Sequence, residues 1–339
     1  MGEVGAGGGD GAESVGIART ANNASRKDFV RQEEERFFDS VAARTPKRSE
    51  EERGHSAQND SGERFSQATA RVSKGKMEMG DGKLTGKCAI VTGGSRGIGR
   101  AIAMRLAHEG AHVVIAARDA KTLAATAGEI SKAGGEVTTF AGDLRDPEKV
   151  DALWRLAVES HGGIDIVVNN AGATRRGEFV ELADTDWMDG FALKLFCAVR
   201  LLRAAWPYLK ERRGAVLNII GTGGRTPGPE FTLGGAVNGA FLSFTKALAD
   251  VGVRDGVQVN AINPGYIRTD RLQGWIKSVA AETGGDMQAA QREMVRRANI
   301  VKIGEPEEIA SLAAFILSPE NRLLHGALID LDGGLTKTV

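Results

Sequence analysis

Three glycines at fixed spacing have the pattern needed to bind the phosphates of a nucleotide. Gly93, Gly97 and Gly99 follow the apolar run "CAIVT" and open a helical pattern. Gly93 permits a tight turn, Gly97 lets backbone amides approach a pyrophosphate, and Gly99 lets the new helix pack against the preceding strand. The amino end of that helix then faces the anion. Glycines alone serve many turns, but this place between a strand and a helix predicts a dinucleotide site.

The end of the second apolar run, "VVIAARD", bears on which nicotinamide cofactor is bound. Chains that bind NAD usually place an acidic residue there, to accept from the ribose 2'-hydroxyl. Here Ala117 leaves room and Arg118 offers a cation, while Arg96 in the glycine segment is a second cation for a 2'-phosphate. We therefore expect NADP(H), with NAD(H) as the alternative. Asp119 keeps that alternative open, because a shift of one residue would place its carboxylate in the phosphate position; in another alternative, both arginines are simply solvated.

A single lysine lies on an otherwise apolar helical pattern, "DWMDGFALKLFCAVRLLRAAW". None of its neighbours one turn away is acidic; they are Gly190, Phe191, Cys197 and Ala198. Burial on such a face would lower the pKa of Lys194 towards neutrality. Such an amine could hold a ribose, donate a proton or form a Schiff base with a carbonyl. The alternative is that Lys194 extends to solvent.

The elements that must position these residues are short apolar runs that alternate with helical patterns. Seven runs are expected to be strands covered on both faces, since their apolar residues are nearly continuous: "CAIVTGG", "HVVIAAR", "VTTFAGD", "IDIVVNNAG", "GAVLNIIG", "VQVNAINPG" and "GALIDLDGG". Segments such as 100–109 and 147–160 are long enough for crossover helices. Repetition of strand, helix and strand predicts an α/β fold, a doubly wound Rossmann-type parallel sheet in a single domain over residues 84–339.

The composition of the chain limits the classes of partner that it is expected to bind. The chain has 339 residues, of which 42% are hydrophobic, and its 44 basic and 44 acidic residues cancel. Because no net field attracts nucleic acid or an anionic membrane, we expect small-molecule partners. Cys88 and Cys197 fall in a predicted strand and a predicted helix, so no disulfide is expected. The absence of a long apolar run or a signal-like amino terminus favours the cytoplasm.

The amino-terminal segment differs in composition from the rest of the chain: it contains no leucine before Leu84. Residues 1–80 are rich in glycine and charge, and are predicted to form a disordered, low-complexity tail. Two alternatives remain. Residues 29–41 have partly helical spacing and could form a partner-binding arm, or the working protein could begin at Met77 or Met79.

Taken together, the motifs resemble those of the short-chain dehydrogenase/reductase family. The resemblance covers Leu84 to Val339 and rests on "TGGSRGIG", "GDL", "NNAG", "NPGYIRT" and the closing "DGG". It implies that Asp143 brackets the adenine, Asn170 to Gly172 line the adenosine side, and Pro264 to Thr269 hold the nicotinamide. With the glycine segment, the implied cofactor residues are Gly93, Ser95, Arg96, Gly97, Ile98, Gly99, Arg118, Asp143, Leu144, Asn170, Ala171, Gly172, Pro264, Gly265, Ile267 and Thr269.

The family's catalytic residues are resembled only in outline. Aligned on "FTKALA" and Trp187, the tyrosine position holds Gly234, the lysine position Asn238, the serine position Gly221 and the helix-four asparagine position Lys194. Lysine and asparagine have thus exchanged places. We expect Lys194 to enter the pocket from the opposite wall, opposite Asn238, with Tyr266 and Thr222 as weaker catalytic candidates and Arg225 as another.

The sequence supports an NADP(H)-dependent oxidoreductase acting on a small carbonyl, alcohol or conjugated enone. Two alternatives stay open: a cofactor-binding protein without turnover, and a lysine-assisted lyase or aldol-type enzyme. A helical insertion after Thr269 should cover the substrate, with Trp275, Ile276 and Met287 as apolar lining and Arg271 or Arg292 meeting a carboxylate or phosphate. The resemblance also implies a homodimer or homotetramer built on the fourth and fifth helices.

Overall fold

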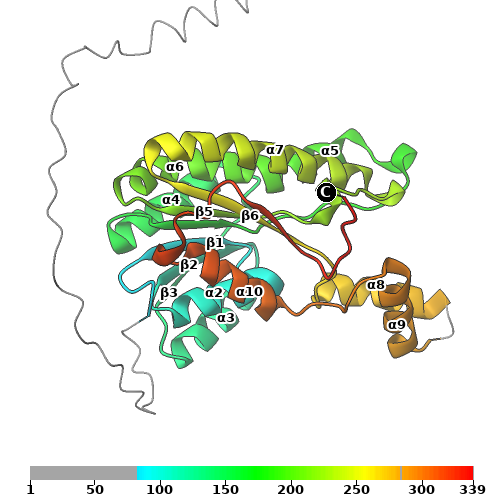
Figure 1. Ribbon diagram of the computed structural model, residues 1–339. Coiled ribbons are helices and arrows are strands. Elements are labelled where there is room, and N and C mark those ends of the chain that lie inside the picture. Colours follow the sequence, from blue (N-terminus) through cyan, green and yellow to red (C-terminus); the bar gives the residue numbers. More distant parts are fainter. Residues whose placement is uncertain (1–81, 283–284, 339) are drawn as a thin grey trace, which may run out of the picture. The chain divides into compact units, whose positions relative to one another are not determined.

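The computed structural model describes residues 82–282 and 285–338. The predicted tail, the possible arm at 29–41 and the alternative starts at Met77 and Met79 lie outside the described residues. Within them, seven parallel strands form one sheet in the order β3-β2-β1-β4-β5-β6-β7 (Figure 1). The expected doubly wound parallel sheet is confirmed, because the strand order reverses at β1.

The strands agree closely with the seven runs found in the sequence. They are β1 Cys88–Thr92, β2 His112–Ala117, β3 Val137–Ala141, β4 Ile166–Asn169, β5 Ala215–Ile219, β6 Gln258–Pro264 and β7 Leu328–Leu331. The helices are α2 Gly97–His108, α3 Ala120–Lys132, α4 Pro147–His161, α5 Asp184–Phe191, α6 Cys197–Glu211, α7 Thr232–Asp255, α8 Asp270–Glu282, α9 Met287–Ala298 and α10 Pro306–Leu317.

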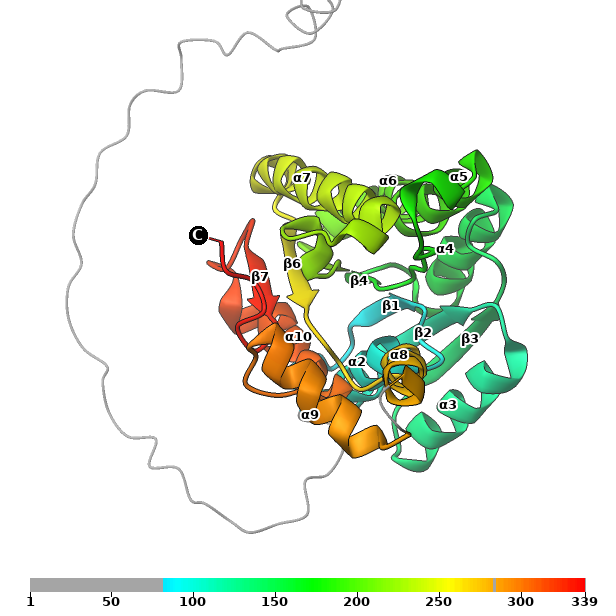
Figure 2. The ribbon, with the colours of Figure 1, turned by 90° about the vertical axis from the view of Figure 1, so that its right-hand side faces the viewer.

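Helices cover both faces of the sheet. One apolar core joins the sheet to α2, α3 and α10, and a second joins its other face to α4, α6 and α7. Alternate residues of a central strand supply the two cores: in β1, Ala89 and Val91 face the first and Cys88 and Ile90 the second. The carboxyl ends of the strands lie at one edge, which faces the viewer in Figure 2 with α5, α8 and α9 around it.

The sequence overestimated the coverage of the two edge strands. β1, β4, β5 and β6 are buried throughout, but every residue of β3 and β7 is half-buried or exposed. Continuous burial was therefore wrong for β3 and β7, because each has a neighbouring strand on one side only. None of the described helices is long and apolar enough to cross a membrane.

The predicted fourth helix is interrupted where its lysine lies. Between α5 and α6, residues Ala192–Phe196 form a π-helical turn, which contains Lys194. Such turns contain one residue more than an α-helical turn and are frequent at functional sites. The predicted insertion after Thr269 is two helices, α8 and α9, which share a small core that includes Ile276 and Met294.

Candidate active site

The glycine segment forms a tight cradle at the carboxyl end of β1. Gly93 has a φ of 66°, and a Cβ there would lie 2.8 Å from Nδ2 of Asn170. A Cβ on Gly99 would lie 2.2 Å from the Gly93 oxygen. Asn170 fixes the cradle, since its side-chain amide donates to the carbonyls of Thr92 and Gly93. Only glycine fits at these two places, as the phosphate-site prediction required.

The amino end of α2 is chemically suited to an anion. The helix begins at Gly97 without a side-chain cap and has no acidic residue in its first turn, so the amides around Ile98 and the helix dipole remain available. The carbonyl of Ser95 accepts from the Thr126 hydroxyl at 3.0 Å, which ties the loop to α3. These features fit the pyrophosphate of a dinucleotide.

The structure decides the role of Asp119. Its carboxylate accepts from the Thr122 amide at 2.6 Å and caps α3, and that backbone hydrogen bond lowers its pKa. Arg118 makes no hydrogen bond or ion pair to any described residue, and it lines a pocket. Among the described residues, the one ion-pair contact of Arg96 is with Asp270 at 4.0 Å, and both side chains are exposed. Two cations are thus available at the end of β2 and in the cradle, whereas the carboxylate is engaged.

The remaining cofactor residues line the carboxyl ends of neighbouring strands. The Asn170 and Ala171 amides both donate to the Thr92 hydroxyl at 3.0 Å. Asp143 accepts from the Arg145 guanidinium, which lowers the pKa of that carboxyl. The neighbouring Leu144 is buried in the core of the α4 face.

The loop after β6 closes over the cradle from the other side. A Cβ on Gly97 would lie 3.2 Å from Cγ2 of Thr269, so the two loops meet. Gly265, next to Pro264, approaches the backbone of Asp332 so closely that a Cβ would lie 2.7 Å from its Cα. Ile267 forms an isolated parallel bridge with Gly304. The predicted nicotinamide segment is therefore held at the mouth of the cradle.

Lys194 of the π-helical turn and Asn238 of α7 are in contact. Lys194 Nζ donates to Oδ1 of Asn238 at 2.6 Å and to the carbonyl of Ile220 at 2.5 Å. Its aliphatic stem lies along Gly172, where a Cβ would be 3.1 Å from Cδ of the lysine. Both hydrogen bonds end inside the site, so the alternative in which Lys194 extends to solvent is wrong.

Burial lowers the pKa of Lys194 to about 7, and the positive charge of Arg271 adds to this effect. Arg271 is near because its guanidinium donates to the carbonyl of Gly172 at 2.9 Å. Around neutral pH the amine therefore exists in both protonation states, as a group that donates and accepts protons requires.

A phenyl ring fills the space beside Gly234, the predicted tyrosine position. A Cβ on Gly234 would lie 2.0 Å from Cζ of Phe231, the last residue of a short 3₁₀ turn, Pro229–Phe231. Gly221, at the predicted serine position, has a φ of 122°, which other residues rarely adopt. In this backbone, neither position accepts the family's usual side chain without rearrangement.

An arginine at the site lies against two aromatic rings. The Arg176 guanidinium lies 4.3 Å from the centre of the Phe231 ring and 5.5 Å from that of Trp275. Tyr266 packs edge-on against Trp275, and burial raises its pKa.

The other catalytic candidates are placed differently. Within the described part of the chain, neither Tyr266 nor Thr222 hydrogen-bonds to Lys194 or Asn238. Arg225 pairs with Asp330 at 3.1 Å and ties the β5 loop to β7, and Arg292 lies 3.9 Å from Asp286 at the exposed start of α9.

The family model described as enoyl-(acyl carrier protein) reductase matches residues 93–336. This range includes the cradle, the contact between Lys194 and Asn238, and the loop after β6. The chain belongs to the short-chain dehydrogenase/reductase family. Among curated relatives of this family, an uncharacterized oxidoreductase, MT0954, from Mycobacterium tuberculosis is 38% identical over 256 residues, covering 75% of this chain and 94% of its own. The 3-oxoacyl-[acyl-carrier-protein] reductase FabG of Vibrio cholerae is 32% identical, covering 74% of this chain and 98% of its own.

Solved structures of this family superpose over the same region. L-sorbose reductase from Gluconobacter frateurii, complexed with NADPH and L-sorbose, gives a TM-score of 0.73 at 34% identity and covers 77% of this chain and 100% of its own. An actinorhodin polyketide ketoreductase with NADPH gives a TM-score of 0.71 at 30% identity, covering 76% and 99%. Both share the fold and were solved with the phosphorylated cofactor.

Sequence reasoning missed Phe231 and Arg176. The signal available was indirect: a glycine early in a helix, with an aromatic residue three positions before it, leaves room for that ring to turn back onto the helix. No pattern marked Arg176, because its position depends on the loop after β4.

Proposed function

We propose that this protein is an NADP(H)-dependent oxidoreductase that acts on a small carbonyl or alcohol, or on a conjugated enone, with Lys194 as its proton donor and acceptor. The observation that carries the proposal is the contact of Lys194 Nζ with Asn238 Oδ1, at 2.6 Å, beside the mouth of the cradle. In the predicted alignment the family's lysine and asparagine have exchanged helices, and the contact between Lys194 and Asn238 supports the proposal that the amine keeps its role.

The preference for NADP(H) rests on three observations. Asp119 caps α3, and this hydrogen bond supports the register in which Ala117, not an acid, stands where NAD-binding chains place a carboxylate. Arg118 and Arg96 are available for a 2'-phosphate. Structural neighbours were solved with NADPH. NAD(H) is the weaker alternative.

The proposed chemistry divides between cofactor and protein. NADP(H), when bound, supplies or accepts the hydride. The protein must provide a proton to the substrate oxygen, and the Lys194 ammonium is the donor. Asn238 Oδ1 and the Ile220 carbonyl aim its Nζ, and burial keeps its pKa near neutrality, so the proton can be given up readily. General acid catalysis of this kind contributes roughly 10²- to 10⁴-fold.

The charge around the site favours a substrate that carries an anionic group. Burial, and then the positive charges of Arg96 and Arg176, lower the pKa of Arg271. Arg271 and Arg176 are therefore the proposed contacts for a carboxylate or phosphate of the substrate. The exposed Trp275 ring beside Arg176 would cover its apolar part.

A second candidate function is cofactor binding without turnover, as a sensor or as a partner subunit. The Phe231 ring supports it, because a phenyl group stands where the family's tyrosine would begin and has no hydroxyl. A lysine-assisted lyase reaction is a third candidate, which needs the neutral form of Lys194.

One experiment separates these functions. NADPH binding is followed by fluorescence, and a panel of acidic and neutral carbonyls and enones is screened for loss of NADPH absorbance. Lys194→Ala should retain NADPH binding and lose roughly 10²- to 10⁴-fold in kcat. Lys246→Ala is the matched control, because Lys246 also donates to a backbone carbonyl, that of Gly326, outside the site.

The outcomes are distinct. Binding without turnover on any substrate favours the second function, and turnover unchanged by Lys194→Ala removes the assignment of Lys194. Consumption of substrate without any change in NADPH absorbance favours the lyase reaction.

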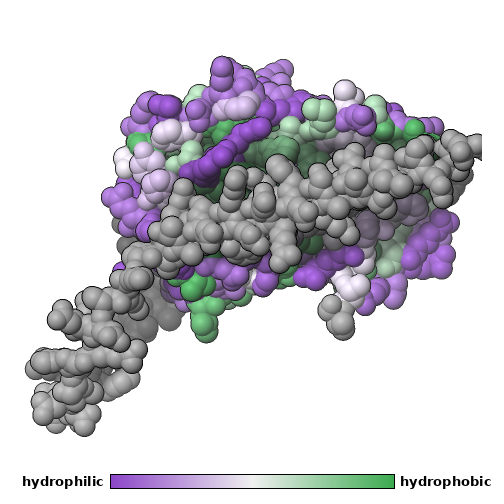
Figure 3. Space-filling model, turned by 90° about the horizontal axis from the view of Figure 1, so that it is seen from above, coloured by the Kyte–Doolittle hydropathy of each residue, from purple (hydrophilic) through white to green (hydrophobic). Residues whose placement is uncertain are grey.

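We further propose that the protein is a homodimer or homotetramer that pairs through α6 and α7. On the face over these helices, hydrophobic side chains lie among hydrophilic ones (Figure 3). At the ends of the two helices, Phe196 and Val253 are exposed by 47% and 71%. Light scattering at defined concentrations tests this, and Val253→Asp should weaken the association if α7 lies in the interface.

A further inference from the structure

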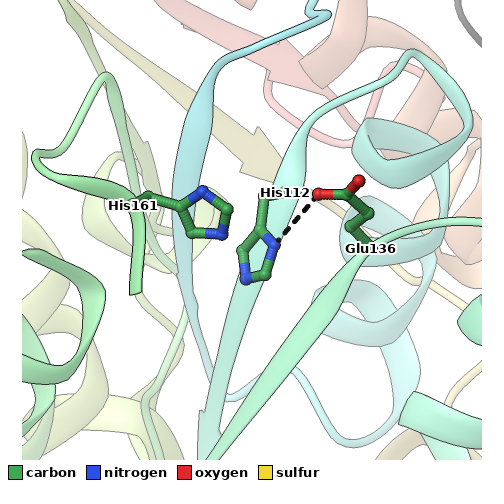
Figure 4. Close-up of side chains that lie close together, drawn as sticks. All are labelled: His112, Glu136 and His161. Carbon is green, nitrogen blue, oxygen red and sulfur yellow. Dashed lines mark hydrogen bonds and ion pairs between the residues drawn. The ribbon is translucent and has the colours of Figure 1, made fainter. Parts of the chain in front are cut away.

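Two histidines and a glutamate meet at the amino edge of the sheet, opposite the cradle. His112 begins β2, Glu136 immediately precedes β3, and His161 ends α4 (Figure 4). The β2 and β3 register explains the first contact, since Val113 pairs with Val137 and the preceding residues are therefore neighbours. The proposed oxidoreductase function makes no use of this trio.

The spacing of the ligand atoms suits a small cation. One nitrogen or oxygen from each of the three residues lies within 4.8 Å of the other two. His112 Nδ1 and Glu136 Oε2 are 3.4 Å apart, which is long for a hydrogen bond. Two ligands on one tetrahedral zinc ion, each about 2.1 Å from the metal, are separated by about 3.4 Å. The pair therefore already has the separation of two zinc ligands.

The second nitrogen of His112 has the support that metal-binding histidines usually have. Nε2 lies 2.8 Å from the hydroxyl of Thr138, which holds the ring in place. When Nε2 carries the proton and donates to Thr138, the lone pair of Nδ1 faces the Glu136 carboxylate. A cation between these two groups would turn a repulsive contact into an attractive one.

His161 offers a nitrogen that has no other use. Its Nε2 is buried and has no hydrogen-bond partner in the structure, a costly arrangement for a polar atom. The rings of His161 and His112 are in contact, with centroids 3.4 Å apart. Burial, and then the neighbouring His161, lower the pKa of His112, although Glu136 opposes this. Neutral imidazole is the form that binds a metal.

We propose that His112, Glu136 and His161 form a Zn²⁺ site, with a fourth position open to solvent. Two imidazoles and one carboxylate are ligands that zinc prefers. The Glu136 side chain is 76% exposed and can turn toward the ion, whereas the two rings are held by the strand and the helix. The bound ion would link β2, the segment before β3 and the end of α4.

The test is titration of the full chain, without a polyhistidine tag, with ZnCl₂ by calorimetry and with Co²⁺ by visible absorption. Binding of one ion per chain, with the intense visible bands of four-coordinate Co²⁺, is expected. Tm should rise with Zn²⁺ concentration, because the ion binds the folded state. His161→Gln and Glu136→Gln should each lower the affinity more than tenfold, and Thr138→Val should lower it about tenfold.

His108→Gln is the matched control, because His108 is an exposed histidine on α2, outside the trio. It should bind Zn²⁺ as the unaltered chain does. The proposal is overturned if no ion binds, or if Glu136→Gln and His161→Gln bind it with unchanged affinity and Tm response. Glu136→Gln keeps the test decisive if a histidine variant fails to fold, since its side chain is largely in solvent. NADPH binding is measured separately, so failure here leaves the proposed function standing.

Discussion

A buried carboxylate at the amino edge of the sheet has all its charge partners, whereas several cations at the carboxyl edge have none in the part of the chain that the structure describes. At the amino edge, the buried Asp165 carboxylate accepts from Lys87 at 3.0 Å, from Arg212 at 2.9 Å and from the Cys88 amide at 3.0 Å. Burial alone would raise the pKa of Asp165, but these hydrogen bonds lower it. The buried carboxylate therefore has three hydrogen-bond donors, which offset the cost of its burial.

At the carboxyl edge, several cations near Lys194 lack an ion-pair partner among the described residues. Lys194, Arg271 and Arg176 make no ion pair with any described residue, and Arg96 has only Asp270 at 4.0 Å. Uncompensated positive charge costs stability and persists where a ligand is to supply the anion. The comparison teaches that the fully paired Asp165 serves the fold, whereas the cations without an ion pair lie where ligands bind in a sheet of this topology.

The largest effect is expected from removal of the paired charge. Asp165→Asn should lower the free energy of unfolding by about 3 kcal/mol, since it leaves two partly buried cations without their counter-charge. Denaturant titration measures this loss, while kcat per folded molecule should not change. Glu320→Gln, which breaks the exposed pair with Lys83, should cost less than about 1 kcal/mol. Equal losses in the two variants would contradict the claim that the buried Asp165 stabilises the fold more than an exposed ion pair does.

The pH dependence of the reaction rate tests the role of Lys194 at the carboxyl edge. The pKa of Lys194 is about 7, and its ammonium form is the proposed donor, so carbonyl reduction should be fastest below pH 7. Above pH 7 the rate should fall about tenfold per pH unit. Alcohol oxidation should show the reverse, rising as the amine becomes neutral. A stopped-flow profile with the same slope in Lys194→Ala would assign the pH dependence to another group.

The ring that fills the tyrosine position can be tested through packing. Gly234→Ala should destabilise the fold by about 1–3 kcal/mol, because the new methyl group would meet the Phe231 ring. The double variant with Phe231→Ala should remove the clash, giving a favourable coupling energy in a double-mutant cycle. Gly239→Ala, in the same helix with no atom closer than 3.8 Å to its Cβ, should stabilise by about 1 kcal/mol. If both glycine variants stabilise, Phe231 does not hold that space.

The smallest effect concerns the choice of cofactor. Arg118→Ala should weaken NADPH binding about tenfold, through loss of a charged hydrogen bond to the 2'-phosphate, and leave NADH affinity unchanged. Isothermal titration with both cofactors measures the difference. Arg203→Ala, an exposed arginine on α6, is the control. An equal loss for both cofactors would place Arg118 elsewhere on the nucleotide.

Sequence reasoning was strongest where residue type and backbone geometry are tightly coupled. The cradle could be predicted because positions such as Gly93 and Gly99 admit only glycine, and the central strands because burial on both faces demands continuous apolar residues. The environment of Lys194 was also anticipated, since the absence of acidic neighbours one turn away indicated burial.

What could not be predicted depends on tertiary contacts. The exposure of β3 and β7 follows from sheet order rather than from their composition. The capping role of Asp119 depends on one hydrogen bond, to the Thr122 amide. With the chain shifted by a single residue, the same carboxylate would instead lie at the phosphate position. The placement of Phe231 and Arg176, and the meeting of His112 with His161, join segments whose separation along the chain carries no periodic signal.

The π-helical turn at Ala192–Phe196 has a consequence for the helix as a whole. An α-helix advances about 100° per residue, so one additional residue rotates everything after it by roughly that angle relative to everything before. α5 can therefore place Gly190 against Leu233 of α7 while α6 directs Leu201 into the core between α6 and the sheet. Deleting one residue from this turn would restore a continuous α-helix. Either Lys194 would then lose its position in the site, or Leu201 would lose its contact with the core.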